Sequence, residues 1–168
     1  MIAGYGRAFS MNVLVWGREG SLSRAKADGY AVAAGKQELL EQADLLSLHL
    51  KLTHETKGVV TRTDLATVKP DSLLANTSRA ELIEFGALES ALRNGRPGFA
   101  AVDVFEEEPI LGATHPLLEL SNALCTPHLG YFEKDCYERY FGQVFEHVVA
   151  FAEGRPINVV NREVLWGS

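Results

Sequence analysis

Short runs of consecutive apolar residues recur along the chain, and polar stretches separate them. Because these apolar residues are consecutive rather than alternating, the runs are typical of strands that are buried on both faces of a parallel sheet. They predict strands at residues 13–16, 30–33, 44–50, 72–76, 100–102 and 123–125.

Apolar residues with helical spacing fill most of the intervals between these runs. They predict helices at residues 22–28, 36–42, 63–68, 84–93 and 133–153, and Ser21 or Ser23 is available as the N-cap of the first. The alternation of strand and helix favours an α/β fold of the Rossmann-like type, a doubly wound parallel sheet with helices on both faces. We expect one domain over residues 1–154 and a C-terminal tail over residues 155–168.

The first residues lack the usual start of such a fold. Gly4-Tyr5-Gly6 resembles the beginning of a GxGxxG phosphate loop, but Phe9 stands at the last glycine position and only Met1-Ile2-Ala3 precede the motif. Since a phosphate loop needs a strand before it, we interpret residues 4–9 as the second half of a helix. The first strand and the glycine-rich loop are therefore expected to be absent.

In the doubly wound order the first strand lies at the centre of the sheet. Without it, the neighbouring strands are left with unpaired backbone groups, which are costly when they are buried. The resulting hypothesis is that the chain is a C-terminal fragment of a longer protein.

The composition narrows the range of partners. The 168 residues carry a formal net charge of −6, so the basic surface of a nucleic-acid-binding protein is missing. No apolar run approaches the roughly 20 residues that a membrane span needs, and no signal peptide is recognisable. Cys125 and Cys136 form no CxxC pair, which fits a reducing cytoplasm. The histidines lack metal-ligand spacing such as HExxH, so no metal site is expected.

Two of the predicted strands lead to ionisable groups. The strand at 100–102 is followed by Asp103 and then by Glu106-Glu107-Glu108, and the strand at 123–125 leads to Thr126-Pro127-His128. Ligands of open α/β sheets bind at the carboxyl ends of strands, where a carboxylate beside an imidazole forms an acid–base pair. The alternatives are a solvated acidic run and a structural histidine.

Arg79 follows the strand at 72–76 and has two interpretations. It is a surface residue after a turn, or its guanidinium binds the carboxylate of a substrate, a role that the planar fork of arginine favours. Asp103 has two interpretations as well, because it either caps a loop or hydrogen-bonds a cofactor amide.

Three ordered motifs, NTSRAELIE, AAVDVFEEEP and CTPHLG, resemble those of the D-isomer-specific 2-hydroxyacid dehydrogenases, and LLSLHLKLTHETKGVV is similar to a further segment of that family. The family includes phosphoglycerate dehydrogenases and glyoxylate/hydroxypyruvate reductases, and the resemblance covers nearly the whole chain. It implies NAD(P)-dependent hydride transfer between the nicotinamide and a small 2-hydroxy or 2-oxo acid. It also implies a homodimer.

The resemblance implies a role for individual residues. Arg79 binds the carboxylate and the keto oxygen of the substrate, His128 exchanges the proton, and Glu108 orients the imidazole and keeps its pKa high enough to donate. Asp103 contacts the nicotinamide carboxamide. The residues implied in cofactor binding are Gly17, Arg18, Leu50, Thr77, Ser78, Arg79, Asp103, His128 and Gly130.

The strand at residues 13–16, which matches the second strand of the family, departs from the family pattern at its end. The family usually has an acidic residue there, which binds the adenosine ribose, whereas Gly17-Arg18 follows Trp16 in this chain. An arginine in this place suits a 2′-phosphate and hence NADP, but it is equally consistent with a solvated turn. The cofactor is thus expected to be NAD or NADP.

The missing strand and loop leave three hypotheses about function. The chain is an NAD(P)-dependent 2-hydroxyacid dehydrogenase or part of one. Alternatively, it is a catalytically inactive remnant that acts as a dimerisation or binding module. In the third hypothesis it pairs with a separate N-terminal chain.

Overall fold

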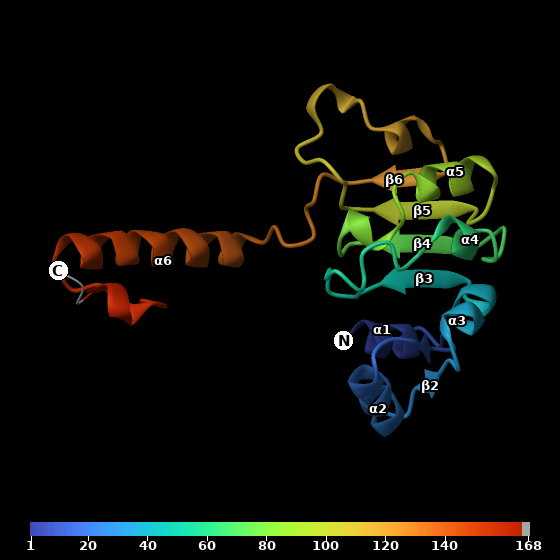
Figure 1. Cartoon of the computed structure of the whole chain (residues 1–168), viewed down its shortest axis with the longest axis horizontal. Helices are drawn as coiled ribbons and strands as arrows, with labels where there is room; N and C mark the ends of the chain where they lie inside the picture. The colour runs from blue at the N-terminus through green and yellow to red at the C-terminus, as the bar shows by residue number, and fades with distance from the viewer. Residues whose placement is uncertain (166–168) are drawn as a thin grey trace. The chain divides into compact units, whose positions relative to one another are not determined.

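The computed structural model describes residues 1–165 and divides into two compact units. The first unit is Met1–His128, and the second begins at Leu129. Figure 1 shows the first unit as a row of parallel strands with helices packed beside them. The predicted domain over residues 1–154 covers the first unit and part of the second, and its boundary at residue 154 stays a prediction.

The elements of the first unit alternate as the sequence predicts. Its strands are β1 (Leu14–Val15), β2 (Ala31–Val32), β3 (Leu45–Leu48), β4 (Leu73–Asn76), β5 (Phe99–Val102) and β6 (Ala123–Cys125). Its helices are α1 (Ile2–Ala8), α2 (Glu19–Ala27), α3 (Lys36–Gln42), α4 (Arg62–Leu65) and α5 (Ala87–Arg93), with 3₁₀ turns η1 (Ala80–Leu82), η2 (Leu111–Ala113) and η3 (Pro116–Glu119). The described strands pair in parallel. The Rossmann-like α/β class is therefore confirmed.

The prediction for the start of α2 is wrong. The helix begins at Glu19, and its N-cap is Arg18 rather than Ser21 or Ser23. Arg18 is in an extended conformation, and its carbonyl oxygen accepts hydrogen bonds from the N–H groups of Ser21 at 2.8 Å and Leu22 at 3.1 Å. The first turn thus closes on the Arg18 carbonyl, and both serines lie inside the helix.

The core lies on one face of the four-stranded sheet β3–β6. Alternate residues of the strands are buried there, including Leu48, Leu74 and Val102, and they pack in one cluster with Leu65 and Leu88 of the covering helices. In Figure 1, α4 overlaps the sheet at β4, and α5 overlaps it near β5 and β6. Positions on the opposite face are half-buried or exposed, so the two faces of the sheet are buried unequally.

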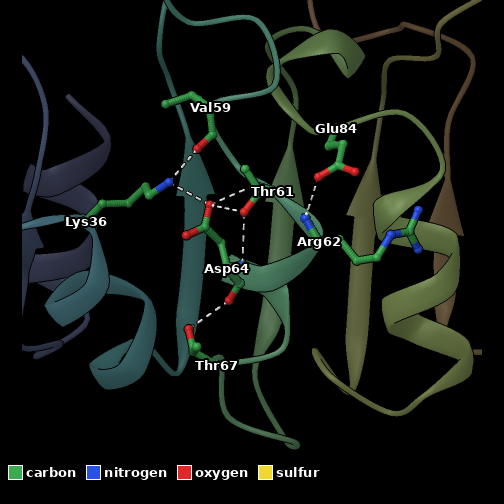
Figure 2. A network of polar contacts seen from close by, with 7 residues as sticks. All are labelled: Lys36, Val59, Thr61, Arg62, Asp64, Thr67 and Glu84. Carbon is green, nitrogen blue, oxygen red and sulfur yellow. Dashed lines mark hydrogen bonds and ion pairs between the residues drawn. The ribbon is translucent and has the colours of Figure 1, made fainter.

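A polar network fixes the helix α4 between α3 and the segment that leads to α5 (Figure 2). Asp64 is buried and forms a capping box with Thr61, whose hydroxyl accepts the Asp64 N–H at 3.1 Å while Asp64 Oδ2 accepts the Thr61 N–H at 2.7 Å. Lys36 Nζ lies 2.6 Å from Asp64 Oδ2 and donates to the Val59 carbonyl at 2.9 Å. The Arg62 N–H donates to Glu84 Oε2 at 2.9 Å.

The parallel strands fall into two separate sheets. One has the order β1–β2 and the other has the order β3–β4–β5–β6. In the doubly wound order, the first strand of the fold lies between the second and the fourth strands and pairs with both. Among the described residues, no strand joins β1 of the smaller sheet to β3 of the larger one. The prediction that residues 4–9 form a helix is confirmed, because α1 covers most of them.

The second unit contains the long helix α6 (Lys134–Ala152) and the 3₁₀ turn η4 (Arg162–Leu165). The predicted helix at 133–153 is thus confirmed to within one residue at each end, whereas the sequence pattern did not indicate η4. A stripe of apolar side chains on α6 is exposed within the unit and comprises Tyr137, Phe141, Val144, Val148 and Phe151. None of the helices in the described part of the chain has the length and apolar character needed to cross a membrane.

Candidate active site

The carboxyl ends of three neighbouring strands bring the predicted polar residues to one edge of the sheet. Asn76 at the end of β4 is in register with Val102 of β5, and Val102 is in register with Cys125 of β6. Because parallel strands all end at the same edge, the segments that follow them meet there. These segments carry Arg79, Asp103 and His128.

Asn76 shapes the turn that presents Arg79. Its side chain is buried, its Nδ2 donates to the Arg79 carbonyl at 2.9 Å, and its Oδ1 accepts the Ser78 N–H at 3.1 Å. Both ends of the turn are therefore bound to one fixed amide. Arg79 itself is exposed, and its guanidinium donates to the Ser78 carbonyl at 2.6 Å.

Glu108 and His128 form the acid–base pair that the sequence suggests. Glu108 Oε2 lies 2.7 Å from His128 Nδ1, and Glu108 Oε1 accepts the Phe105 N–H at 2.8 Å. Burial raises the pKa of the Glu108 carboxyl, but the hydrogen bonds from His128 and Phe105 outweigh burial, so this pKa lies below its usual range. An ionised carboxylate only accepts hydrogen bonds, so His128 carries a proton on Nδ1.

A cavity of about 260 Å³ joins this pair to Arg79. Its walls include Arg79, Glu108 and His128, together with Glu81 and Glu106. His128 adopts a left-handed backbone conformation with φ of 56°, which is uncommon for a residue with a side chain and is found disproportionately at functional sites. The structure therefore gathers the three predicted catalytic residues around one space.

Several of the predicted cofactor-binding residues lie at the same edge. The Ser78 hydroxyl donates to the Leu50 carbonyl at 2.9 Å, which links the ends of β4 and β3. Asp103 is buried, and Thr126 donates its hydroxyl proton to Asp103 Oδ1 at 2.5 Å. Hydroxyl and carboxylate groups at this edge supply the donors and acceptors that a nicotinamide carboxamide needs. The residues present thus fit the nicotinamide end of a dinucleotide.

The remaining predicted cofactor-binding residues are Gly17, Arg18, Thr77 and Gly130. Thr77 is exposed beside Ser78, whereas Gly17 and Arg18 follow β1 in the smaller sheet. The pKa of Glu55, in the turn after β3, is lowered first by a hydrogen bond from Thr53 and to a smaller extent by the charge of Arg18. Gly130 belongs to the second unit, and its role in cofactor binding stays a prediction.

The sequence interpretation missed two polar arrangements at this site. The sequence places Asn76 at the end of a strand and the start of a turn, but it does not reveal that the Asn76 amide binds both Ser78 and Arg79. The contact between His115 Nε2 and Glu106 Oε2 at 3.1 Å was also missed, because no sequence pattern connects residues nine positions apart in a loop. Within the described residues, no group of three or more His, Cys, Asp or Glu side chains is arranged to hold a metal ion.

Comparison with known families agrees with this geometry. Residues 1–130 match the family described as D-isomer specific 2-hydroxyacid dehydrogenase, NAD binding domain. The chain belongs to this family. The motif residues Arg79, Glu108 and His128 of this D-isomer-specific 2-hydroxyacid dehydrogenase domain all lie within the matched range.

Relatives of this dehydrogenase domain are about twice as long as the chain. Glyoxylate reductase from Aeropyrum pernix is 38% identical over 165 residues, which are 98% of this chain and 49% of the relative. The structure of a phosphoglycerate oxidoreductase from Vibrio cholerae is 54% identical, with a TM-score of 0.85 over 91% of this chain and 49% of the other. D-lactate dehydrogenase from Aquifex aeolicus, solved with NAD and lactic acid, is 32% identical, with a TM-score of 0.73 over 92% of this chain and 50% of the other. The chain thus spans about half the length of these relatives.

Proposed function

We propose that this chain supplies the catalytic, nicotinamide-facing part of an NAD(P)-dependent 2-hydroxyacid dehydrogenase. The observation that carries the proposal is the Glu108–His128 pair at 2.7 Å, which shares a cavity with Arg79. The reduction of a 2-oxo acid requires a cation that binds the substrate carboxylate. It also requires an oriented imidazole that protonates the carbonyl oxygen. The substrate is accordingly a small 2-oxo or 2-hydroxy acid.

The chemistry of the three residues follows from their contacts. Arg79 binds the substrate carboxylate through its guanidinium fork. Glu108 holds and orients the imidazole of His128 through Nδ1. The imidazole gives a proton to the carbonyl oxygen during reduction and takes it back during oxidation. The bound nicotinamide supplies or accepts the hydride, and the protein positions the reacting groups.

We assign the nicotinamide end of the cofactor to Leu50, Thr77, Ser78 and Asp103, and the adenosine end to Gly17 and Arg18. The contacts of Ser78 with Leu50 and of Asp103 with Thr126 support the first assignment. The exposed Arg18 at the end of β1 supports the second, and with it NADP as the cofactor. The functional assembly is a homodimer, in line with the family resemblance.

A chimaeric enzyme tests the proposed function. The residues of Aeropyrum pernix glyoxylate reductase that match this chain are replaced by the chain, and the reduction of glyoxylate by NADH and by NADPH is followed. We expect turnover. His128→Gln in the chimaera lowers kcat by about 100-fold or more, because the proton donor is lost.

Matched variants separate this role from general damage to the fold. Arg79→Gln raises KM by roughly tenfold or more, because a charge-assisted hydrogen bond to the substrate is removed. His54→Gln replaces an exposed histidine of the same unit outside the cavity and leaves both constants unchanged. A folded chimaera with equal activity in the His128 and His54 variants would contradict the proposal.

A second candidate function is that of a binding or dimerisation module without catalysis. The observation that favours it is the separation of β1–β2 from β3–β6, since the strand order is interrupted where a dinucleotide would cross the sheet. The purified chain distinguishes the two functions. Saturable binding of NADH or NADPH supports the dehydrogenase, and dimer formation without nucleotide binding supports the module.

A further inference from the structure

A second histidine–glutamate pair lies beside the catalytic pair. His115 Nδ1 accepts the Leu117 N–H at 3.2 Å, and His115 Nε2 lies 3.1 Å from Glu106 Oε2. Because Nδ1 is an acceptor, the proton of the neutral ring is on Nε2 and is donated to the Glu106 carboxylate. Phe105 packs against the ring, with centroids 4.9 Å apart in an edge-to-face arrangement. The tautomer and the orientation of His115 are thus both defined.

Glu106 stands on the wall between two cavities. It lines the catalytic cavity together with Arg79 and His128, and it also lines a larger cleft of about 520 Å³ bounded by α5 and the loop that carries His115. The side chain of Glu106 is one third exposed, whereas that of His115 is more buried at 19%. A carboxylate in this place can turn toward either space, and the bond to His115 holds it on the side of the loop.

In the described part of the chain, the guanidinium of Arg79 is not paired with any of the carboxylates around it. Within residues 1–165 its guanidinium makes no ion pair, although the carboxylates of Glu81, Glu106 and Glu108 line the same cavity. Glu108 is held by His128 and Phe105, and Glu106 is held by His115. An arginine that binds a substrate carboxylate has to be kept from neighbouring protein carboxylates, since these compete for the same donors.

We propose that His115 is a positioning residue, which binds Glu106 and so keeps the Glu106 carboxylate away from Arg79. The guanidinium of Arg79 is then free to bind the carboxylate of a 2-oxo acid. This inference rests on the proposed function for the identity of the ligand, but the competition between Glu106 and substrate for Arg79 is a property of the free chain. His115 acts through charge placement and touches neither substrate nor cofactor.

The test follows Arg79 directly by NMR in the full chain. His115→Phe keeps a ring against Phe105 but removes both hydrogen bonds, which releases Glu106. We expect the exchange of the Arg79 Nε–H proton with solvent to slow roughly fivefold, which is the strength of a partly exposed ion pair. The double variant His115→Phe/Glu106→Gln returns the exchange rate to the wild-type value, because the released carboxylate is gone.

Two further variants separate charge placement from loosening of the loop. His115→Gln retains an amide that can accept from Leu117 and donate to Glu106, so its exchange rate stays within twofold of wild type. His115→Phe/Glu81→Gln removes a carboxylate of the same cavity that His115 does not contact, and it keeps the slow exchange. We expect the ¹⁵N shifts of wild-type His115 to show a protonated Nε2 and an unprotonated Nδ1.

Three results overturn the proposal. They are an unchanged Arg79 exchange rate in His115→Phe, a slow rate that Glu106→Gln does not reverse, and a wild-type His115 protonated on Nδ1. A titration with oxalate, used as a carboxylate probe, tests the proposed function separately. Oxalate that shifts the Arg79 signal and binds roughly fivefold more weakly to His115→Phe supports both ideas, whereas oxalate that never shifts it argues against the substrate role of Arg79 alone.

Discussion

Asn76 shows how one buried amide prepares an exposed cation for binding. The amide binds both the Ser78 N–H and the Arg79 carbonyl, so the direction in which Arg79 leaves the sheet is set before any ligand arrives. Because folding already orders this backbone, the proposed binding of a substrate carboxylate to Arg79 does not have to order it.

The replacement Asn76→Ala is expected to lower the free energy of unfolding by about 2 kcal/mol, because two buried hydrogen bonds are lost and the Ser78 N–H is left without its acceptor. Urea denaturation at pH 7 measures the change. The matched control is Asn94→Ala, in which the exposed C-cap asparagine of α5 is replaced, with an effect below about 0.5 kcal/mol. Equal effects of the two substitutions would show that the Asn76 amide does not hold the turn.

The proposed catalytic residues are more predictable from sequence than the residues that contact and position their segments. Arg79, Glu108 and His128 follow predicted strand ends, and the edge of a parallel sheet brings such positions together. The partners of Asn76 and His115 depend on the path of loops, which no residue periodicity describes. The roles of the catalytic residues and of the cofactor-binding residues stay predictions until activity or binding is measured.

At the scale of elements, the short helix α4 depends on polar contacts more than on its length. It has four residues, far fewer than an isolated helix needs for stability in water. The capping box and the ion pair with Lys36 replace that missing stability and connect α3, α4 and the Glu84 segment that leads to α5 (Figure 2).

Asp64 makes the stability of this region dependent on pH. Burial raises the pKa of its carboxyl, but the hydrogen bonds from Lys36 and Thr61 outweigh burial and hold the pKa below its usual range. The unfolded chain therefore binds the proton more readily. The stabilisation is complete above about pH 4, where an unfolded aspartate ionises, and it is lost as the pH falls through the lower pKa of the folded state.

The variant Asp64→Asn tests this dependence. We expect it to unfold more easily at pH 7 by about 1–2 kcal/mol and to lose less stability than wild type on acidification below about pH 4. Urea denaturation from pH 7 to pH 3 measures both effects. Asp71→Asn, at an exposed position, serves as the control, and a wild-type acid dependence in Asp64→Asn would exclude Asp64 as its source.

Element types were more predictable than element ends. α3 and β6 agree with the prediction at both ends, because clear turn residues bound them. The ends of α2 and α4 differ from the prediction. Arg18 supplies a backbone cap to α2, and α4 ends at Leu65, which is three residues before its expected end. Backbone conformation decides such ends, and side-chain patterns report it only indirectly.

For the whole molecule, the proposed assignment of the adenosine end to Gly17 and Arg18 is tested by the preference between the two nucleotides. With Trp166→Phe as background, the fluorescence of Trp16 at the end of β1 reports on binding of NADH and NADPH to the full chain. We expect Arg18→Ala to weaken NADPH binding by roughly tenfold, the value of a charge-assisted hydrogen bond, and to leave NADH binding within twofold.

The control for this titration is Arg24→Ala, an exposed arginine within α2. It should change neither affinity. Equal weakening of NADH and NADPH by Arg18→Ala would show that Arg18 does not recognise a 2′-phosphate.

The lack of pairing between β1 and β3 affects how the protein behaves in solution. Among residues 1–165, no strand pairs with the outer edge of β3, which reads Leu45-Leu46-Ser47-Leu48 and carries no charged side chain. Natural sheets usually protect such edges with lysine, proline or a bulge, because a bare edge templates the addition of foreign strands. We therefore expect a concentrated sample in which this edge stays uncovered to be lost through self-association sooner than through unfolding.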